Sequence, residues 1–300
     1  MKTIAKLLTL LMLCTGLCAC APQQEAQVAA TTSPVYQFTE FLCQGTPITV
    51  TRLITEEVSC IHDYTLTVSQ MRALEGAEVV VLSGAGLEEF MHEALESAEC
   101  VIDSSEGIEL LEGSCHHEHE HGDEEGHDHD HTHNHELDAH IWLSPENAAA
   151  MARNIQNGLS ERYPEFADQI ESNGQLLLAE ITAVDDYARE QLTELSSREI
   201  ITFHDGFGYL AQAFDLHILE AIEEESGSEP SAQELIELIE TVEHHSVAAI
   251  FTEINGSSSA ASVISAETGV PIYTLDMSMS GDNWFEAMYR NIDTLKEALQ

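Results

Sequence analysis

Apolar and polar residues alternate in two patterns along residues 27–103, and these patterns predict strands separated by helices. Short apolar runs bounded by turn residues are typical of strands in a covered sheet, whereas apolar residues three or four positions apart indicate amphipathic helices. The predicted strands cover residues 27–31, 48–54, 78–83 and 100–103. The predicted helices cover residues 34–42, 67–75 and 87–97.

The same alternation returns in the last third of the chain. Strands are predicted at residues 199–203, 216–220, 247–252 and 271–275. Helices are predicted at residues 207–214, 231–244, 258–268 and 284–299. Strands that alternate with helices favour parallel pairing, because each parallel connection needs a crossover. The predicted fold class is α/β, with two βα lobes that each contain a mainly parallel four-stranded sheet.

Strong helix signals fill the stretch between the two lobes. Ser144 is a good N-cap and Pro145 suits the first helical position, so a helix is expected to run to about residue 160. Residues 165–195 continue with helix-forming residues and no internal proline. About thirty helical residues would span roughly 45 Å, the length of a lobe. One long linker helix is therefore expected, between an N-terminal lobe and a C-terminal lobe. The expected boundaries are 27–144 for the first lobe, 145–195 for the linker helices and 196–300 for the second lobe.

Residues 1–19 resemble the signal peptide of a bacterial lipoprotein. The chain begins with a short basic region, residues 7–13 are apolar, and a small residue precedes Cys20. Cleavage before Cys20 and acylation of its thiol would anchor the mature chain outside the cytoplasmic membrane through a tether of residues 20–26. An ordinary secretory signal cut elsewhere is the alternative. Later apolar segments are too short to cross a bilayer, so the mature protein is expected to be soluble.

Charge is strongly unbalanced, with 54 Asp and Glu against 10 Lys and Arg and a formal net charge of -44. Such a surface repels phosphate backbones and anionic lipid, which excludes nucleic acid as a partner. The same field raises the local concentration of divalent cations. Composition therefore favours a cation as the ligand.

Nine of the 16 histidines lie within residues 115–136, the His-rich segment. They are His116, His117, His119, His121, His127, His129, His131, His133 and His135. Imidazole suits zinc, copper and nickel, and the interleaved acidic residues add negative potential, so a disordered collector of weak, exchangeable metal sites is expected. A solvated acidic spacer is the alternative. The zinc-protease pattern at residues 117–121 is set aside, because that chemistry needs a buried helix with both histidines on one face.

Four further candidate ligands fall at the ends of predicted strands or in nearby loops. His204 and Asp276 end strands of the second lobe, whereas His62 and His140 lie in loops of the first lobe. Ligands of open α/β sheets bind at the carboxyl ends of strands, so the four side chains are expected to meet across the cleft between the lobes. Each histidine alone is more often a hydrogen-bonded loop residue. Together, three imidazoles and a carboxylate form a four-coordinate set suited to zinc.

Four cysteines follow Cys20, namely Cys43, Cys60, Cys100 and Cys115. An even number in an oxidising compartment favours disulfides over free thiols. A zinc-thiolate site is the competing interpretation, but their spacing lacks a C-x-x-C pair. Cys60 and Cys115 are expected on the cleft side, and Cys43 and Cys100 at the opposite pole. We therefore predict the pairs Cys60 with Cys115 and Cys43 with Cys100, out of three connectivities.

Nearly the whole mature chain resembles the metal-binding lipoproteins that serve ABC importers of zinc and manganese. The resemblance rests on residues 62–64, 138–147, 203–209 and 229–231, of which the second and third segments are the specific ones. It implies two βα lobes joined by one long helix, with His62, His140 and His204 as ligands and Asp276 as the carboxylate that closes the site. A long His-rich loop before the second ligand is typical of the zinc-importing members. Thr65-Leu66 and Met277-Ser278 depart from the usual family sequence.

The resemblance implies a transport function. A monomeric protein of this kind captures Zn2+ and delivers it to an ABC permease without catalysis. Zn2+ is expected rather than Mn2+, because manganese prefers oxygen ligands and manganese importers usually carry a carboxylate at the position of His204. A surface adhesin or metal buffer of the same fold is the alternative. A zinc-dependent hydrolase is less favoured, because Asp276 would close the position that catalysis leaves open.

Overall fold

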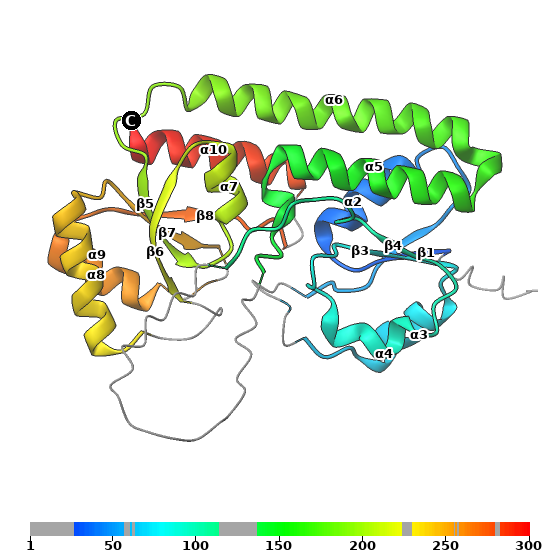
Figure 1. Ribbon diagram of the computed structural model, residues 1–300, viewed down its shortest axis with the longest axis horizontal. Coiled ribbons are helices and arrows are strands. Elements are labelled where there is room, and N and C mark those ends of the chain that lie inside the picture. Colours follow the sequence, from blue (N-terminus) through cyan, green and yellow to red (C-terminus); the bar gives the residue numbers. More distant parts are fainter. Residues whose placement is uncertain are drawn as a thin grey trace, which may run out of the picture.

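The computed structural model describes residues 27–56, 61, 64–113, 137–223, 230–254, 256, 258–279 and 283–300. Within them the chain forms two lobes, each built on a four-stranded parallel sheet (Figure 1). The predicted α/β class is therefore confirmed. The predicted signal peptide, tether and His-rich segment lie outside the described residues, as do His62, Cys60 and Cys115. A helix with the length and apolar character of a membrane span is absent from the described part of the chain.

The first lobe orders its strands β2-β1-β3-β4, and every neighbouring pair is parallel. The strands are β1 (Val28–Ala30), β2 (Val50–Arg52), β3 (Val79–Leu82) and β4 (Val101–Asp103). The helices are α2 (Ser33–Leu42), α3 (Val68–Gly76), the 3-10 turn η1 (Glu89–Met91) and α4 (His92–Leu95). The central strands β1 and β3 are buried along their whole length, as expected when helices cover both faces of a parallel sheet. The helix predicted at residues 87–97 divides into η1 and α4.

The second lobe repeats this arrangement with the order β6-β5-β7-β8, again all parallel. The strands are β5 (Glu199–His204), β6 (His217–Glu223), β7 (Ile250–Glu253) and β8 (Ile272–Leu275). The helices are α7 (Gly208–Ala213), α8 (Ala232–His245), α9 (Ser259–Thr268) and α10 (Trp284–Leu299). Apolar residues of α8 and α9 pack on β5 and β7 and form a separate small core. All four predicted strands of this lobe are present.

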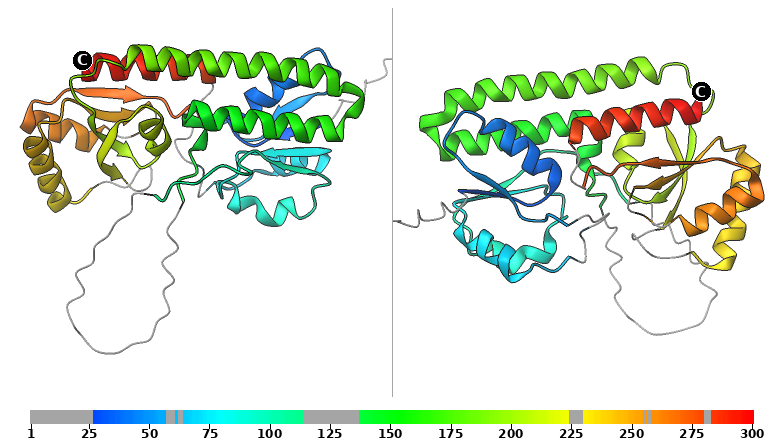
Figure 2. Two further views of the ribbon diagram at one scale, coloured as in Figure 1. Left: turned by 45° about the horizontal axis from the view of Figure 1, so that its top comes forward. Right: turned by 180° about the vertical axis from the view of Figure 1, so that it is seen from behind.

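Two antiparallel helices connect the lobes. The connection consists of the 3-10 turn η2 (Ile141–Leu143), α5 (Pro145–Arg162), the 3-10 turn η3 (Pro164–Phe166) and α6 (Ala167–Gln191). Ser144 caps α5 as predicted, since its Oγ accepts a hydrogen bond from the backbone N–H of Asn147 at 3.4 Å. The 25 residues of α6 span about 38 Å and contact α5, α2 and α10. Figure 2 shows α10 running alongside α6, so one helical layer covers both lobes.

One continuous apolar core extends from the first lobe into the second. Trp142 and Trp284 are fully buried at the junction. Nε1 of Trp284 donates to the carbonyl of Trp142 at 3.0 Å, and Nε1 of Trp142 donates to the carbonyl of Met277 at 2.8 Å. The guanidinium of Arg52, at the end of β2, donates to the carbonyl of Met279 at 2.9 Å. These contacts hold the carboxyl ends of the two sheets toward each other.

Candidate metal centre

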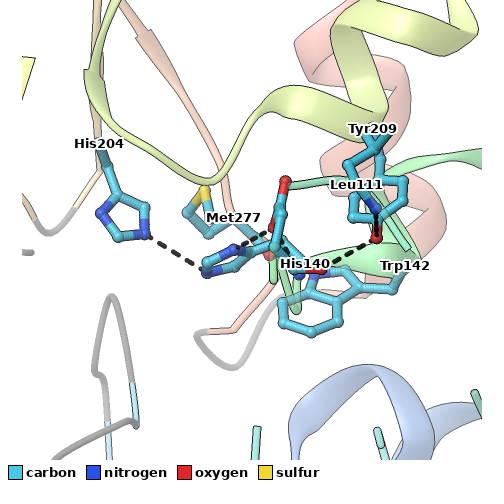
Figure 3. A network of polar contacts seen from close by, with 7 residues as sticks. Leu111, His140, Trp142, His204, Tyr209 and Met277 are labelled. Atoms are coloured by element: carbon cyan, nitrogen blue, oxygen red, sulfur yellow. Dashed lines mark hydrogen bonds and ion pairs between the residues drawn. The ribbon is translucent and has the colours of Figure 1, made fainter. Parts of the chain in front are cut away.

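His140 and His204 approach each other between the two lobes (Figure 3). His204 is the last residue of β5, and His140 directly precedes η2. Both residues are buried, with 3% and 2% of their surface exposed. Their Nε2 atoms lie 3.4 Å apart, and the ring planes cross at 87°. A hydrogen bond of this length would be long. Two nitrogens that bind the same tetrahedral zinc ion, each at about 2.0–2.1 Å, lie about 3.3 Å from each other. The two Nε2 atoms therefore have the spacing of two ligands on one zinc ion.

The Asp138 carboxylate orients the imidazole of His140. Its Oδ1 lies 2.9 Å from Nδ1 of His140 and also accepts a hydrogen bond from the His140 backbone N–H at 2.8 Å. An Nδ1–H that donates to this carboxylate leaves the lone pair on Nε2, the atom that faces His204. Asp138 is itself held in place, because its carbonyl accepts a hydrogen bond from the Tyr209 hydroxyl at 2.9 Å. The His140 ring is thus fixed in the orientation and tautomer that metal binding requires.

Gly206 leaves the space into which the two imidazoles fit. A Cβ at this position would lie 2.7 Å from Cδ2 of His204, 2.7 Å from Cε of Met277 and 2.9 Å from Cε1 of His140. All three contacts are shorter than any that real Cβ atoms make. The Met277 methyl group borders the same space, so the loop that follows β8 forms one wall of the site (Figure 3).

Asp276 is buried directly after β8, and other groups of the protein already bind its carboxylate. Oδ1 accepts a hydrogen bond from the Ser278 backbone N–H at 2.8 Å, and Oδ2 lies 2.5 Å from Nη2 of Arg290 in α10. Among the described residues, no three His, Cys, Asp or Glu side chains are placed to hold one ion. The predicted four-residue set is therefore only partly assembled. The structure brings His140 and His204 together, His62 lies outside the described residues, and Asp276 is paired with Arg290.

The cysteines differ from the prediction. Cys43, at the carboxyl end of α2, and Cys100, before β4, are both free thiols, so the predicted disulfide between them is absent. A common pole is not sufficient, because a disulfide needs the two Cβ atoms within about 4.5 Å. Burial raises the pKa of the Cys43 thiol to about 12, which keeps it protonated and unreactive.

Sequence reasoning missed three residues that build this site. Asp138 lies two positions before His140, and this Asp-x-His spacing is the signal that could have identified it. Tyr209 reaches the site from α7 and also accepts a hydrogen bond from the Leu111 backbone N–H at 2.9 Å (Figure 3). Arg290 lies fourteen positions after its partner Asp276, and nothing in the local sequence connects them.

Comparison with known proteins gives the family. The family model described as "ZnuA: Zinc-uptake complex component A periplasmic" matches residues 28–298. The chain belongs to this family. The predicted resemblance to the metal-binding proteins of ABC importers is thereby confirmed, and the ZnuA family is a component of uptake complexes located outside the cytoplasm.

Individual known proteins are similar to this chain over most of its length. The zinc-binding lipoprotein AdcA of Streptococcus pneumoniae (strain TIGR4) is 29% identical over 297 residues, which cover 94% of this chain and 58% of AdcA. The zinc-binding protein AdcA of Streptococcus pyogenes serotype M1 is 26% identical over 290 residues, 91% of this chain and 56% of that protein. The chain therefore spans less than two thirds of these relatives. A crystal structure of ZnuA superposes with a TM-score of 0.76 at 30% identity and covers 92% of this chain and 100% of the other.

Proposed function

We propose that this ZnuA-family protein captures Zn2+ outside the cytoplasmic membrane and delivers it to an ABC permease. The observation that carries the proposal is the 3.4 Å separation between the Nε2 atoms of His140 and His204, which suits two ligands on one zinc ion. The family description as a component of zinc uptake supports the same cargo. Imidazole ligands favour zinc over manganese, which prefers oxygen.

The proposed ligands are the imidazoles of His62, His140 and His204. His62 follows β2, so its loop leaves the sheet edge that faces the second lobe. Asp276, the fourth residue predicted from the sequence, is engaged by Ser278 and Arg290 and is not one of the proposed ligands. Because His140 precedes the linker helices and His204 ends a strand of the second lobe, one ion bound by both would tie the two lobes together.

Three features outside the described residues complete the proposal. Acylated Cys20 anchors the chain to the outer face of the cytoplasmic membrane, where the protein works as a monomer beside its permease. The His-rich segment collects zinc at weak sites, helped by the formal net charge of -44. A disulfide between Cys60 and Cys115 holds one end of this segment beside the loop that carries His62.

Transport is favoured over the alternatives. A hydrolase needs an open coordination position and a general base, and membership of an uptake family supports a binding role without catalysis. An adhesin or a metal buffer of the same fold would bind zinc in the same way without feeding an importer. Deletion of the gene separates these functions, because only an importer component is required for growth at scarce zinc.

Titration calorimetry of the mature protein with Zn2+ tests the proposed ligands. His140→Ala should weaken the tightest site by at least about 100-fold, because loss of an outer-shell partner alone costs up to that much. His92→Ala is the matched control, since His92 is exposed at the start of α4 and should leave affinity unchanged. Unchanged stoichiometry and affinity in His140→Ala would refute the assignment.

A further inference from the structure

Two of the few cations in this acidic chain converge on the loop after β8. The sequence contains only 10 Lys and Arg against 54 Asp and Glu. Arg52 donates to the Met279 carbonyl at 2.9 Å from the first lobe, and Arg290 pairs with Asp276 from α10. The Asp276 side chain is 2% exposed, whereas the Arg290 side chain is 44% exposed. The guanidinium thus approaches a buried carboxylate from the solvent side.

Helix α10 fixes Asp276 through its backbone as well as through its carboxylate. The Asn291 Oδ1 accepts a hydrogen bond from the Asp276 backbone N–H at 2.8 Å, and Asn291 Nδ2 donates to the Asp276 carbonyl at 2.8 Å. The methyl group of the next residue, Met277, borders the space at Gly206 that the two imidazoles of the candidate metal centre also border. Asp276 is therefore held in the wall of the metal site, while both of its carboxylate oxygens accept hydrogen bonds from the protein, one from Ser278 and one from Arg290.

We propose that Arg290 is a specificity-determining residue, which withholds the Asp276 carboxylate from the bound ion and so leaves a site of neutral imidazoles. This inference rests on the proposed zinc function. The negative field of the chain attracts every divalent cation and cannot select among them. Selection must come from ligand type, and a free carboxylate in the site would favour manganese, calcium and magnesium. Arg290 removes that contribution by supplying the carboxylate with its own cation.

The competing interpretation makes Arg290 only a structural contact for the loop after β8. In that case loss of Arg290 would loosen the loop and lower the affinity for every metal ion by the same factor. Under the proposal, loss of Arg290 leaves a buried carboxylate without its cation, and such a group gains strongly from a divalent ion. The ratio of zinc affinity to manganese affinity separates the two interpretations, because a structural defect alone leaves it unchanged.

The experiment is competition between Zn2+ and Mn2+ in the mature protein, with thermal melting as a check on folding. Arg290→Gln should lower the ratio of zinc to manganese affinity by at least about tenfold, the lower end for outer-shell changes. The double variant Asp276→Asn with Arg290→Gln carries a neutral pair and should restore the wild-type ratio. Arg189→Gln removes the same charge from an exposed pair with Asp185 on α6 and should leave the ratio unchanged.

Asp276→Asn with Arg290 intact keeps the test decisive if Arg290→Gln does not fold. The proposal predicts weaker binding of both ions, because Arg290 is left uncompensated, and an unchanged ratio. A higher ratio in Asp276→Asn would show that the carboxylate already acts as a ligand and would overturn the proposal. An unchanged ratio in folded Arg290→Gln, or no recovery in the double variant, would overturn it too. Absence of tight zinc binding in the wild type would instead refute the proposed function itself.

Discussion

The two groups of histidines in this chain differ in how much of the fold supports them. His140 and His204 are both buried. Asp138 fixes the orientation of the His140 ring, and Gly206 leaves the space that both rings need. The His-rich segment contains nine histidines, but residues 116–136 lack apolar side chains that could bury them. The number of imidazoles sets how many ions a segment can hold, whereas a fixed geometry sets the affinity for a particular ion. We therefore expect the two buried imidazoles to matter more for affinity than the nine others.

Gly206→Ala should cause the largest loss of zinc affinity at the buried pair of histidines. Its Cβ would overlap both imidazoles and Met277, and a displacement of about 1 Å in such a site costs about 100-fold. Calorimetry with Zn2+ measures the loss. Gly107→Ala is the control, because that position has a φ of +78° and open space, so it should cost about 1–2 kcal/mol of stability without loss of affinity. Equal zinc affinity in Gly206→Ala and wild type would show that the pair is not the site.

Asp138→Asn should have the next largest effect, because the variant no longer holds Nδ1–H of His140 with a charged acceptor. We expect zinc affinity to fall by about 10- to 100-fold without unfolding. Asp293→Asn is a suitable control, since Asp293 accepts a hydrogen bond from Tyr187 at 2.6 Å on the exposed side of α10. If both variants bound zinc as the wild type does, orientation of His140 by Asp138 would not contribute to affinity.

Deletion of residues 115–135 tests the other side of the comparison. The tightest ion should keep its affinity within about twofold, as distant and independent sites do. Weaker ions should disappear from metal analysis after equilibrium dialysis, and growth at scarce zinc should become slower. Loss of the tightest ion on deletion would place the high-affinity site in the His-rich segment and reverse the comparison.

Glu88→Gln should leave zinc affinity unchanged and alter only stability. The Glu88 carboxylate accepts hydrogen bonds from the Thr31 hydroxyl at 2.5 Å and from the backbone N–H groups of Ser83 at 2.8 Å and Gly84 at 3.0 Å. Burial is the main reason that the pKa of Glu88 rises from 4.5 to about 7.

The raised pKa of Glu88 gives stability a defined pH dependence. Between pH 4.5 and about 7 the folded protein holds a proton that the unfolded chain releases, so stability falls as pH rises through this window. The slope is at most about 1.4 kcal/mol per pH unit. Urea unfolding at several pH values should show a flatter profile in Glu88→Gln, and an unchanged slope would assign the dependence to other groups.

The sequence predicted the elements well because local signals and the fold agree. Ser144 and Pro145 marked the start of α5, and the apolar run that ends at His204 marked β5. Strand limits were less accurate, since β6 extends to Glu223 through its pairing with β5 and β7 begins only at Ile250. Such limits depend on a neighbouring strand, which no local pattern encodes.

The candidate site was predictable only in part. The end of β5 identified His204, because ligands gather at the carboxyl ends of parallel strands. The pairing of Asp276 with Arg290 could not be foreseen, since it depends on how α10 packs once Trp284 is buried at the junction of the lobes. The Cys43 and Cys100 pairing failed for a related reason, because the pole of a lobe is readable from topology but the distance between two side chains is not.

The most direct test of zinc binding between the lobes is anomalous diffraction from crystals of the mature protein loaded with one equivalent of Zn2+. The account predicts one strong anomalous peak about 2.0–2.1 Å from Nε2 of both His140 and His204. A strong peak elsewhere, with no zinc between these two imidazoles, would contradict it.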